Sequence, residues 1–122
     1  MTQKIINTIK INLMYKKKLI KLKLNKYELN IIKALMKINL IKLVKKNNNH
    51  YFIYLNYFED EPLFKNIVNL NKSSKPIFIT YNMLKYITYK YNIIIILNTN
   101  KGVLTNFEAL NYKLGGVLIL KL

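Results

Sequence analysis

The sequence predicts an α+β fold made of two small α/β lobes that meet near residue 72. Two observations support this fold class. Apolar residues switch between helical and strand spacing along the whole chain, and a polar stretch at 71–76 interrupts that pattern near its middle. The first lobe, residues 1–71, is expected to run helix, strand, helix and then strands. The second, residues 72–122, is expected to hold a mixed sheet with short helices.

The first lobe is expected to begin with a helix and a basic strand. Apolar residues near helical spacing predict a helix over residues 3–14. From Lys18 the apolar period becomes two, so we expect a half-buried strand whose outer face carries Lys21 and Lys23. A solvated face is the ordinary interpretation of such lysines. No acidic residue accompanies them, however, and we favour contact with phosphates.

The clearest helix signal begins at Asn25. Asn25 and Glu28 have the spacing of a capping box, in which the Asn side chain accepts a backbone N–H and the Glu side chain reaches back. An apolar stripe follows them, and it predicts a helix over residues 26–38. Asn39 can adopt the left-handed conformation that ends such a helix.

The rest of the chain is expected to supply strands and two more helices. Strands are predicted over residues 40–44, 51–58, 64–70, 77–81, 93–97 and 117–120. A polar hairpin turn is expected at 45–50 and a helix over 83–91. Thr105 and Glu108 repeat the capping-box spacing, and they predict a short helix that ends near Tyr112.

The charge of the chain indicates a polyanionic partner. The formal net charge is +16, and all 21 basic residues are lysines. AT-rich codon usage explains lysine in place of arginine. It does not explain why only 5 residues are acidic, since Asp and Glu codons tolerate the same bias. Residues 1–46 hold 13 lysines and a single acid, Glu28, so this part of the chain would attract a polyanion most broadly.

No group of residues has the pattern of a catalytic or metal site. The chain has no cysteine, and its one histidine, His50, lies in an Asn-rich turn without a marked nucleophile or orienting partner. Glu59, Asp60 and Glu61 are consecutive, so their carboxylates cannot all converge on one cation. The longest apolar run, 93–97, is too short to span a membrane. We expect no enzyme activity, cofactor, metal, small-molecule substrate or membrane insertion.

A polar loop in the last quarter of the chain is the best candidate for a binding site. It follows an apolar strand and consists of Asn98, Thr99, Asn100, Lys101 and Gly102. Its amide and hydroxyl groups can donate and accept, Lys101 adds charge, and Gly102 permits a tight bend. Such a loop can read sugar hydroxyls and base edges in irregular RNA. The same residues could also form a plain turn, and local chemistry alone does not decide between the two.

An ordered set of signals runs from residue 74 to residue 116: Ser74-Lys75-Pro76, then Tyr81, the polar loop, Glu108-Ala109 and Gly115-Gly116. This order resembles that of one family, the universal small-subunit ribosomal protein S8. This family has S-K-P, a tyrosine-bearing strand, a helix, an apolar strand leading into S-T-S-x-G-V-x-T-x-x-E-A, and then a glycine pair. The matching residues are Ser74 to Pro76, Tyr81, Asn98 to Thr105 with two Ser replaced by Asn, Glu108-Ala109 and Gly115-Gly116. The first lobe matches by its pattern of elements, with Lys10 where the family has an arginine.

Three further residues depart from the family pattern. Ile77 and Lys113 stand where the family has glycines, and Val117 stands where a glutamate follows the glycine pair. The segment from Tyr81 to Gly102 is also about two residues shorter than in the family. These differences concern the turn after the S-K-P motif and the hydrogen bonds of the missing glutamate, and they leave the register of the loop unchanged.

The resemblance implies a structural, non-enzymatic role in the ribosome. It implies binding to a central-domain helix of the small-subunit rRNA, support of subunit assembly, and contact with neighbouring small-subunit proteins. Transferred residue by residue, it implies RNA contacts at Tyr81, Asn98, Thr99, Asn100, Lys101 and Gly102, and further ones at Lys75, Gly115, Gly116 and Lys10. The charge pattern adds Lys21 and Lys23 as phosphate contacts.

The composition also suggests where the protein works. The composition is biased toward residues with AT-rich codons, and we expect no presequence. Together these features point to a gene that is expressed inside an organelle, a mitochondrion by preference and a plastid as second choice. Residues 1–18 lack the Arg and Ser of a transit peptide, so we interpret them as part of the fold. The alternative function is that of a basic peripheral protein lying on anionic membranes through residues 1–18, which leaves the second lobe unexplained.

Overall fold

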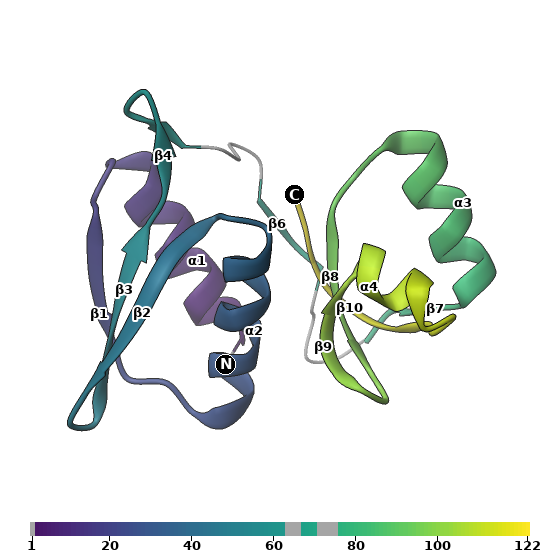
Figure 1. The fold of residues 1–122 in the computed structure, drawn as a ribbon, viewed down its shortest axis with the longest axis horizontal. Coiled ribbons are helices and arrows are strands. Elements are labelled where there is room, and N and C mark those ends of the chain that lie inside the picture. Colours follow the sequence, from purple (N-terminus) through teal and green to yellow (C-terminus); the bar gives the residue numbers. More distant parts are fainter. Residues whose placement is uncertain (1, 63–66, 71–75) are drawn as a thin grey trace. The chain divides into compact units, whose positions relative to one another are not determined.

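The computed structural model describes residues 2–62, 67–70 and 76–122, and it divides the chain into two compact units (Figure 1). The first unit comprises Met1–Lys65 and the second Asn66–Leu122. The boundary expected near residue 72 thus lies later than this division. The difference arises because the strand at residues 68–69 pairs with the last strand of the chain. The expected linker at 71–76 lies outside the described residues except for Pro76.

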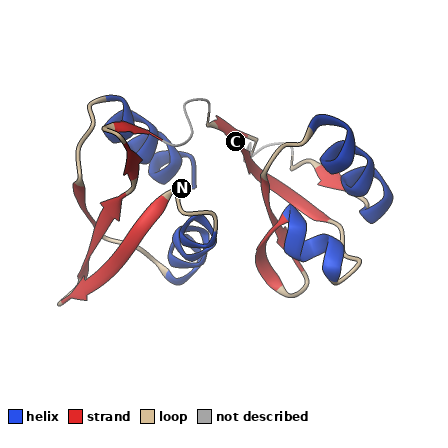
Figure 2. Ribbon diagram, turned by 45° about the horizontal axis from the view of Figure 1, so that its top comes forward, coloured by secondary structure: helices blue, strands red, loops and turns tan. Residues whose placement is uncertain are grey.

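The first unit is a three-stranded antiparallel sheet with two helices on one face (Figure 1, Figure 2). Its elements are α1 (Thr2–Met14), β1 (Leu19–Leu22), α2 (Lys26–Lys37), β2 (Ile41–Asn47), β3 (His50–Leu55), β4 (Tyr57–Phe58) and β5 (Glu61–Pro62). The strand order in the sheet is β1-β3-β2, so β3 is central. The expected order of helix, strand, helix and strands is confirmed.

Helix α2 begins with the capping box that the sequence predicts. The Asn25 side chain accepts the Glu28 N–H at 2.8 Å, and the Glu28 carboxylate accepts the Asn25 N–H at 3.1 Å. Asn39 has a φ of 65°, so it adopts the expected left-handed conformation just after the helix. The apolar stripe of α2, with Ile31 and Leu35 fully buried, faces the core beside the buried residues of α1.

The sequence placed two boundaries around β3 wrongly. The turn between β2 and β3 contains only residues 48–49, because the basic end of β2 continues the ladder as far as Asn47 opposite His50. The strand expected over 51–58 is interrupted at Asn56, whose backbone N–H donates to Leu40 and whose side chain donates to Asn39. Beyond it, β4 and β5 form a separate short hairpin.

The second unit is a five-stranded sheet that carries two helices (Figure 1). Its elements are β6 (Val68–Asn69), β7 (Phe78–Ile79), α3 (Tyr81–Tyr91), β8 (Ile95–Thr99), β9 (Gly102–Thr105), α4 (Asn106–Asn111) and β10 (Gly116–Lys121). The α+β class is confirmed. The sheet expected to be mixed is antiparallel at every pairing among the described residues, because β10 runs opposite to β6, β7 and β8.

Several strands of the second unit are shorter or later than expected. β7 ends at Ile79 because Thr80 becomes the N-cap of α3, accepting the Met83 N–H at 3.4 Å. The strand predicted over 93–97 lies at 95–99 instead, so Asn98 and Thr99 belong to it. The strand predicted over 64–70 is present at 68–69, and its first residues, 64–66, lie outside the described part of the chain.

Candidate nucleic-acid interface

The predicted polar loop is the tip of the β8–β9 hairpin. Thr99 pairs with Gly102 across the two strands, which leaves a turn of two residues, Asn100 and Lys101. The Thr99 hydroxyl donates to the Gly102 carbonyl at 3.0 Å and accepts the Lys101 N–H at 3.1 Å. The hydroxyl therefore holds the shape of the turn. The side chains that this turn leaves exposed are Asn100 and Lys101.

Gly102 fits this turn through its backbone conformation. Its φ is +104°, in the region that residues with a Cβ rarely adopt, and no atom lies within 4 Å of the place where a Cβ would stand. The requirement for glycine at this position is therefore conformational and not steric.

The glycine pair brings three backbone segments together. A Cβ on Gly115 would lie 2.3 Å from the Ile79 carbonyl oxygen, and one on Gly116 would lie 2.3 Å from the Asn98 carbonyl oxygen. In the sheet, Val117 pairs with Phe78 on one side and with Asn98 on the other. The start of β10 is therefore inserted between the ends of β7 and β8. The spacing of the glycine pair is explained by this packing, and its contact with RNA stays a prediction.

Tyr81 lies at the same end of the sheet as the hairpin. It is the first residue of α3, two positions after β7 ends, and its side chain is half-buried. Because β7 and β8 both end beside the start of β10, the segment that carries Tyr81 and the β8–β9 hairpin flank the glycine pair. The structure thus gathers Tyr81, the hairpin residues and the glycine pair, which are the described ones among the predicted residues of the second unit, at one sheet end.

Sequence reasoning missed an aromatic partner of the hairpin. The Lys101 ammonium group lies 4.1 Å from the centroid of the Tyr112 ring, within the range of a cation–π interaction. Tyr112 caps the C-terminal end of α4 and is 53% exposed. The ring therefore holds the lysine beside the hairpin while leaving the charge in solvent. Local spacing gave no sign of this pair, because the two residues lie on different elements.

A buried asparagine connects the two helices of the second unit to strand β8, the first strand of the hairpin. Asn106, the first residue of α4, is fully buried and donates from its side chain to the Thr88 hydroxyl and the Ile93 carbonyl oxygen, both at 2.9 Å. Its side-chain oxygen accepts the Ile95 N–H at 3.3 Å. One amide therefore connects α4 to α3 and to the start of β8. The sequence marked only its neighbours Thr105 and Glu108, whose capping box is confirmed.

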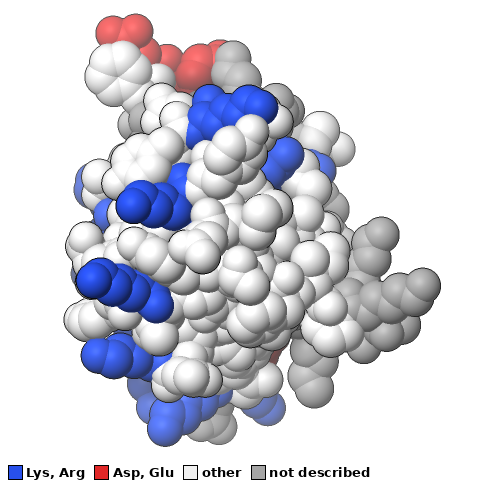
Figure 3. All heavy atoms as spheres, turned by 90° about the vertical axis from the view of Figure 1, so that its right-hand side faces the viewer, with Lys and Arg blue, Asp and Glu red and all other residues white. Residues whose placement is uncertain are grey.

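The described surface of the second unit is basic. Five lysines of the described part are exposed: Lys85, Lys90, Lys101, Lys113 and Lys121. The only acid in the sequence of this unit is Glu108, and its carboxylate accepts the backbone N–H of Thr105 at 3.3 Å. Lysines gather along one margin of the face seen in Figure 3, beside a broad uncharged area. This arrangement favours an anionic partner.

The remaining predicted contacts belong elsewhere in the chain. Lys10 on α1, Lys21 on β1 and Lys23 just after β1 are all exposed residues of the first unit. Lys75 lies outside the described residues. His50 opens β3 and is half-buried, while Glu59 and Asp60, both with positive φ, form the β4–β5 turn. Within the described ranges, no cluster of three or more His, Asp or Glu side chains could hold a metal ion.

Two small units, a basic surface and a preformed polar hairpin are the features of a structural protein that binds nucleic acid. The family model for ribosomal protein S8 matches residues 2–122, and the chain belongs to this family. A curated relative, the small ribosomal subunit protein uS8m of Acanthamoeba castellanii, is 29% identical over 96 residues, covering 77% of this chain and 76% of that protein. The family consists of structural, non-enzymatic components of the ribosome, so the expected non-enzymatic role in the small subunit is confirmed.

Proposed function

We propose that the protein binds a central-domain helix of the small-subunit rRNA and supports assembly of the mitochondrial small subunit. The observation that carries this proposal is the β8–β9 hairpin, which presents Asn100 and Lys101 from a turn closed by Thr99 and Gly102. The second unit exposes further lysines, and lysine contacts with phosphates position a protein on nucleic acid. The partners would be rRNA and neighbouring small-subunit proteins.

The proposed contacts differ in what each residue can contribute. Asn100 and Lys101 would touch the RNA directly, Tyr81 would contact it from the start of α3, and Asn98, Thr99 and Gly102 would act mainly through backbone shape. Further proposed contacts are Lys75, Gly115, Gly116, Lys10, Lys21 and Lys23. Gly116 is buried, so it would act through the packing of β10 against β8 and not by direct contact. Irregular RNA is recognised through such combinations of shape and sugar or phosphate contacts.

A mitochondrial location agrees with two observations. The AT-rich composition suits a gene carried in an organelle, and the "m" in the name of the Acanthamoeba relative marks a mitochondrial protein. We propose an organelle-encoded protein of the matrix ribosome on this basis, with a plastid as the second choice.

The membrane alternative has weaker support in the structure. The apolar residues of α1 that a membrane would have to accept are inside the first unit, with Ile6 2% and Ile9 1% exposed. No helix of the described ranges is both long and apolar enough to cross a bilayer. Binding of residues 1–18 to an anionic surface would therefore require α1 to leave its own core.

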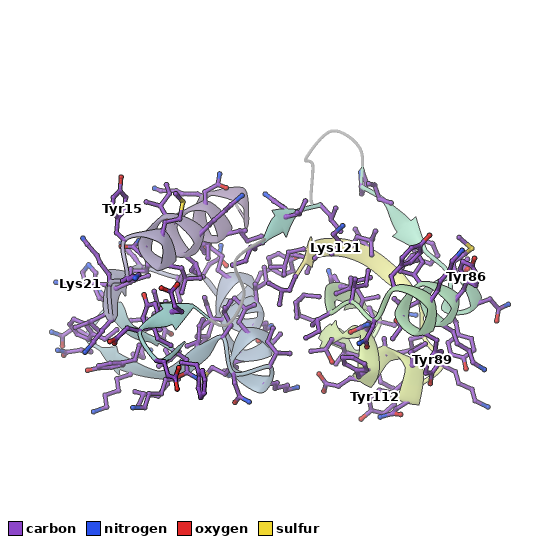
Figure 4. All side chains as sticks on the ribbon, turned by 90° about the horizontal axis from the view of Figure 1, so that it is seen from above. Tyr15, Lys21, Tyr86, Tyr89, Tyr112 and Lys121 are labelled. Carbon is purple, nitrogen blue, oxygen red and sulfur yellow. The ribbon has the colours of Figure 1, made fainter. Side chains whose placement is uncertain are left out.

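The test is binding of the full chain to a transcript of the central rRNA domain from the same organelle. Asn100→Ala with Lys101→Ala removes the exposed groups of the hairpin and keeps the hydrogen bonds of the Thr99 hydroxyl. We expect the dissociation constant to rise by about tenfold or more, given about 1–3 kcal/mol for a group of polar contacts. The matched control for charge is Lys121→Ala, because Lys121 lies at the end of β10 that is farther from the hairpin (Figure 4).

Two outcomes would contradict the proposed rRNA binding. One is failure of the wild-type chain to bind the transcript in low salt. The other is an equal loss for the hairpin variant and for Lys121→Ala, which would mean that charge alone matters. A mitochondrial small subunit that lacks this chain after purification in high salt would count against the assembly role.

A further inference from the structure

The sheet of the first unit has a face that its helices leave uncovered. Helices α1 and α2 lie on the opposite face, where Ile20 of β1 and Ile53 of β3 are buried (Figure 1, Figure 2). Because side chains alternate along a strand, Lys21, Phe52 and Tyr54 project from the other face, which we call the outer sheet face. Lys21 is exposed and lies at the margin of the first unit (Figure 4).

The strand register arranges the outer sheet face in two rows. In one row, Phe52 of the central strand lies between Lys21 of β1 and Lys45 of β2. In the next, Tyr54 lies between apolar residues, Leu19 on β1 and Leu43 on β2. Two aromatic rings therefore occupy the middle of the face, flanked by lysine on both sides in one row and by leucine in the other.

The two lysines extend over the two rings. The Lys21 ammonium group lies 6.0 Å from the centroid of the Phe52 ring, and that of Lys45 lies 5.8 Å from the centroid of the Tyr54 ring. Both rings are half-buried, so part of each remains accessible. The sequences of β1, β2 and β3 contain no acidic residue. The face thus combines π surfaces and positive charge.

This composition is unusual for a face that meets only water. Antiparallel sheets with one solvated face normally carry polar residues there, alternating with the apolar core side. Here the solvated face has Leu19, 45% exposed, beside two aromatic rings. The apolar centre favours a partner with flat, weakly hydrated surfaces, and the flanking lysines favour a partner that is anionic. Unpaired nucleic-acid bases joined by phosphates meet both requirements.

We propose that the outer sheet face is a stacking platform for unpaired bases of RNA, with Phe52 and Tyr54 as the stacking residues. Lys21 and Lys45 would pair with the phosphates on either side. Residues two apart in a strand are separated by roughly 7 Å, which leaves room for one base on each ring. Paired bases in a duplex cannot offer their faces in this way. The proposal rests on the proposed function only in taking RNA as the partner, because it uses a different unit of the chain.

The test uses the full chain and a labelled oligouridylate of about ten nucleotides, with a duplex of the same length as the competitor. Phe52→Leu with Tyr54→Leu removes both rings and keeps apolar side chains in the strand. We expect this variant to bind the single strand at least about tenfold more weakly, and the wild-type chain to prefer single strand over duplex. The matched control is Tyr51→Leu, which removes a ring from the same strand on the opposite face of the sheet; its affinity should stay within about twofold of the wild type.

Salt dependence separates stacking from charge. Phe52→Leu with Tyr54→Leu should leave the slope of log affinity against log salt unchanged, because no phosphate contact is lost. Lys21→Gln with Lys45→Gln should lower that slope by up to about 1.4, since each phosphate contact contributes about 0.7 for a single strand. If a leucine variant does not fold by circular dichroism, ultraviolet crosslinking of the wild-type chain decides, with adducts expected at Phe52 and Tyr54 and not at the buried Ile53.

Three results would overturn the proposal. The first is wild-type affinity in the double leucine variant, and the second is equal binding of duplex and single strand. The third is a double leucine variant that is no longer retained in the small subunit although its affinity for oligouridylate is unchanged. That result would identify a protein as the partner of the outer sheet face. Binding of the central-domain transcript is measured in the same preparations. Comparing it with oligouridylate binding distinguishes a failure of the platform proposal from a failure of the proposed hairpin contact. If Asn100→Ala with Lys101→Ala weakens transcript binding and leaves oligouridylate binding unchanged, the platform proposal is supported.

Discussion

The backbone of Gly116 lies so close to Asn98 that a Cβ atom would stand 2.3 Å from the Asn98 carbonyl oxygen. Real Cβ atoms do not approach an oxygen so closely, so β10 could keep this position only if the residue stays glycine. Gly115 has the same relation to the Ile79 carbonyl oxygen. The pair therefore fixes the separation between the hairpin strand β8 and the end of β7, and with it the place of Tyr81.

Gly116→Ala is expected to destabilise the second unit. The added methyl group meets backbone atoms, which cannot move aside as a side chain could, so β10 must shift away from β8. We expect a loss of about 1–3 kcal/mol or more in the free energy of unfolding of this unit. The measurement is hydrogen exchange of the β8 and β10 amides. Lys121→Ala, on the exposed end of the same strand, should change stability by less than about 0.5 kcal/mol. Unchanged protection in Gly116→Ala would mean that the two strands lie farther apart.

Sequence reasoning predicted elements well where local rules decide them. The capping boxes at Asn25 and Thr105 satisfy backbone donors within three residues, so both helix starts were predicted at the right positions. The boundaries of β7 and β8 depend on long-range pairing with β10, which no local pattern records. The RNA contact of the glycine pair is implied by the family resemblance alone; the spacing of the pair is explained by packing, and the contact stays a prediction. Asn106 and Tyr112 were missed because their partners lie on other elements.

The Thr99 hydroxyl is expected to control the shape of the hairpin. Thr99→Ala removes both of its hydrogen bonds, to the Gly102 carbonyl and from the Lys101 N–H, each worth about 1 kcal/mol. The Lys101 amide should then exchange faster with solvent, and rRNA affinity should fall although no exposed group has been removed. Thr99→Ser keeps the hydroxyl and should restore both properties. If serine fails to rescue affinity, the threonine methyl group and not the turn geometry would be responsible.

Asn106 is expected to be the most sensitive polar residue of the second unit. Asn106→Leu leaves the Thr88 hydroxyl, the Ile93 carbonyl oxygen and the Ile95 N–H without this partner in a buried site. Each unsatisfied group costs about 1–3 kcal/mol, so we expect a total loss of several kcal/mol in unfolding free energy. Thermal denaturation followed by circular dichroism measures it. The control is Asn111→Leu at the exposed end of the same helix, and a similar loss in both variants would refute the role assigned to Asn106.

The contact between Lys101 and Tyr112 allows a quantitative test of how the hairpin charge is positioned. A double-mutant cycle with Lys101→Gln and Tyr112→Leu measures their coupling, which we expect to be about 0.5–1 kcal/mol at this exposed site. Measuring the rRNA affinity of the same four proteins distinguishes two roles of the Tyr112 ring. If Tyr112 only holds the lysine, Tyr112→Leu should weaken binding in the wild-type background and have no further effect in Lys101→Gln. Additive losses would instead show that the Tyr112 ring contacts the RNA independently of Lys101.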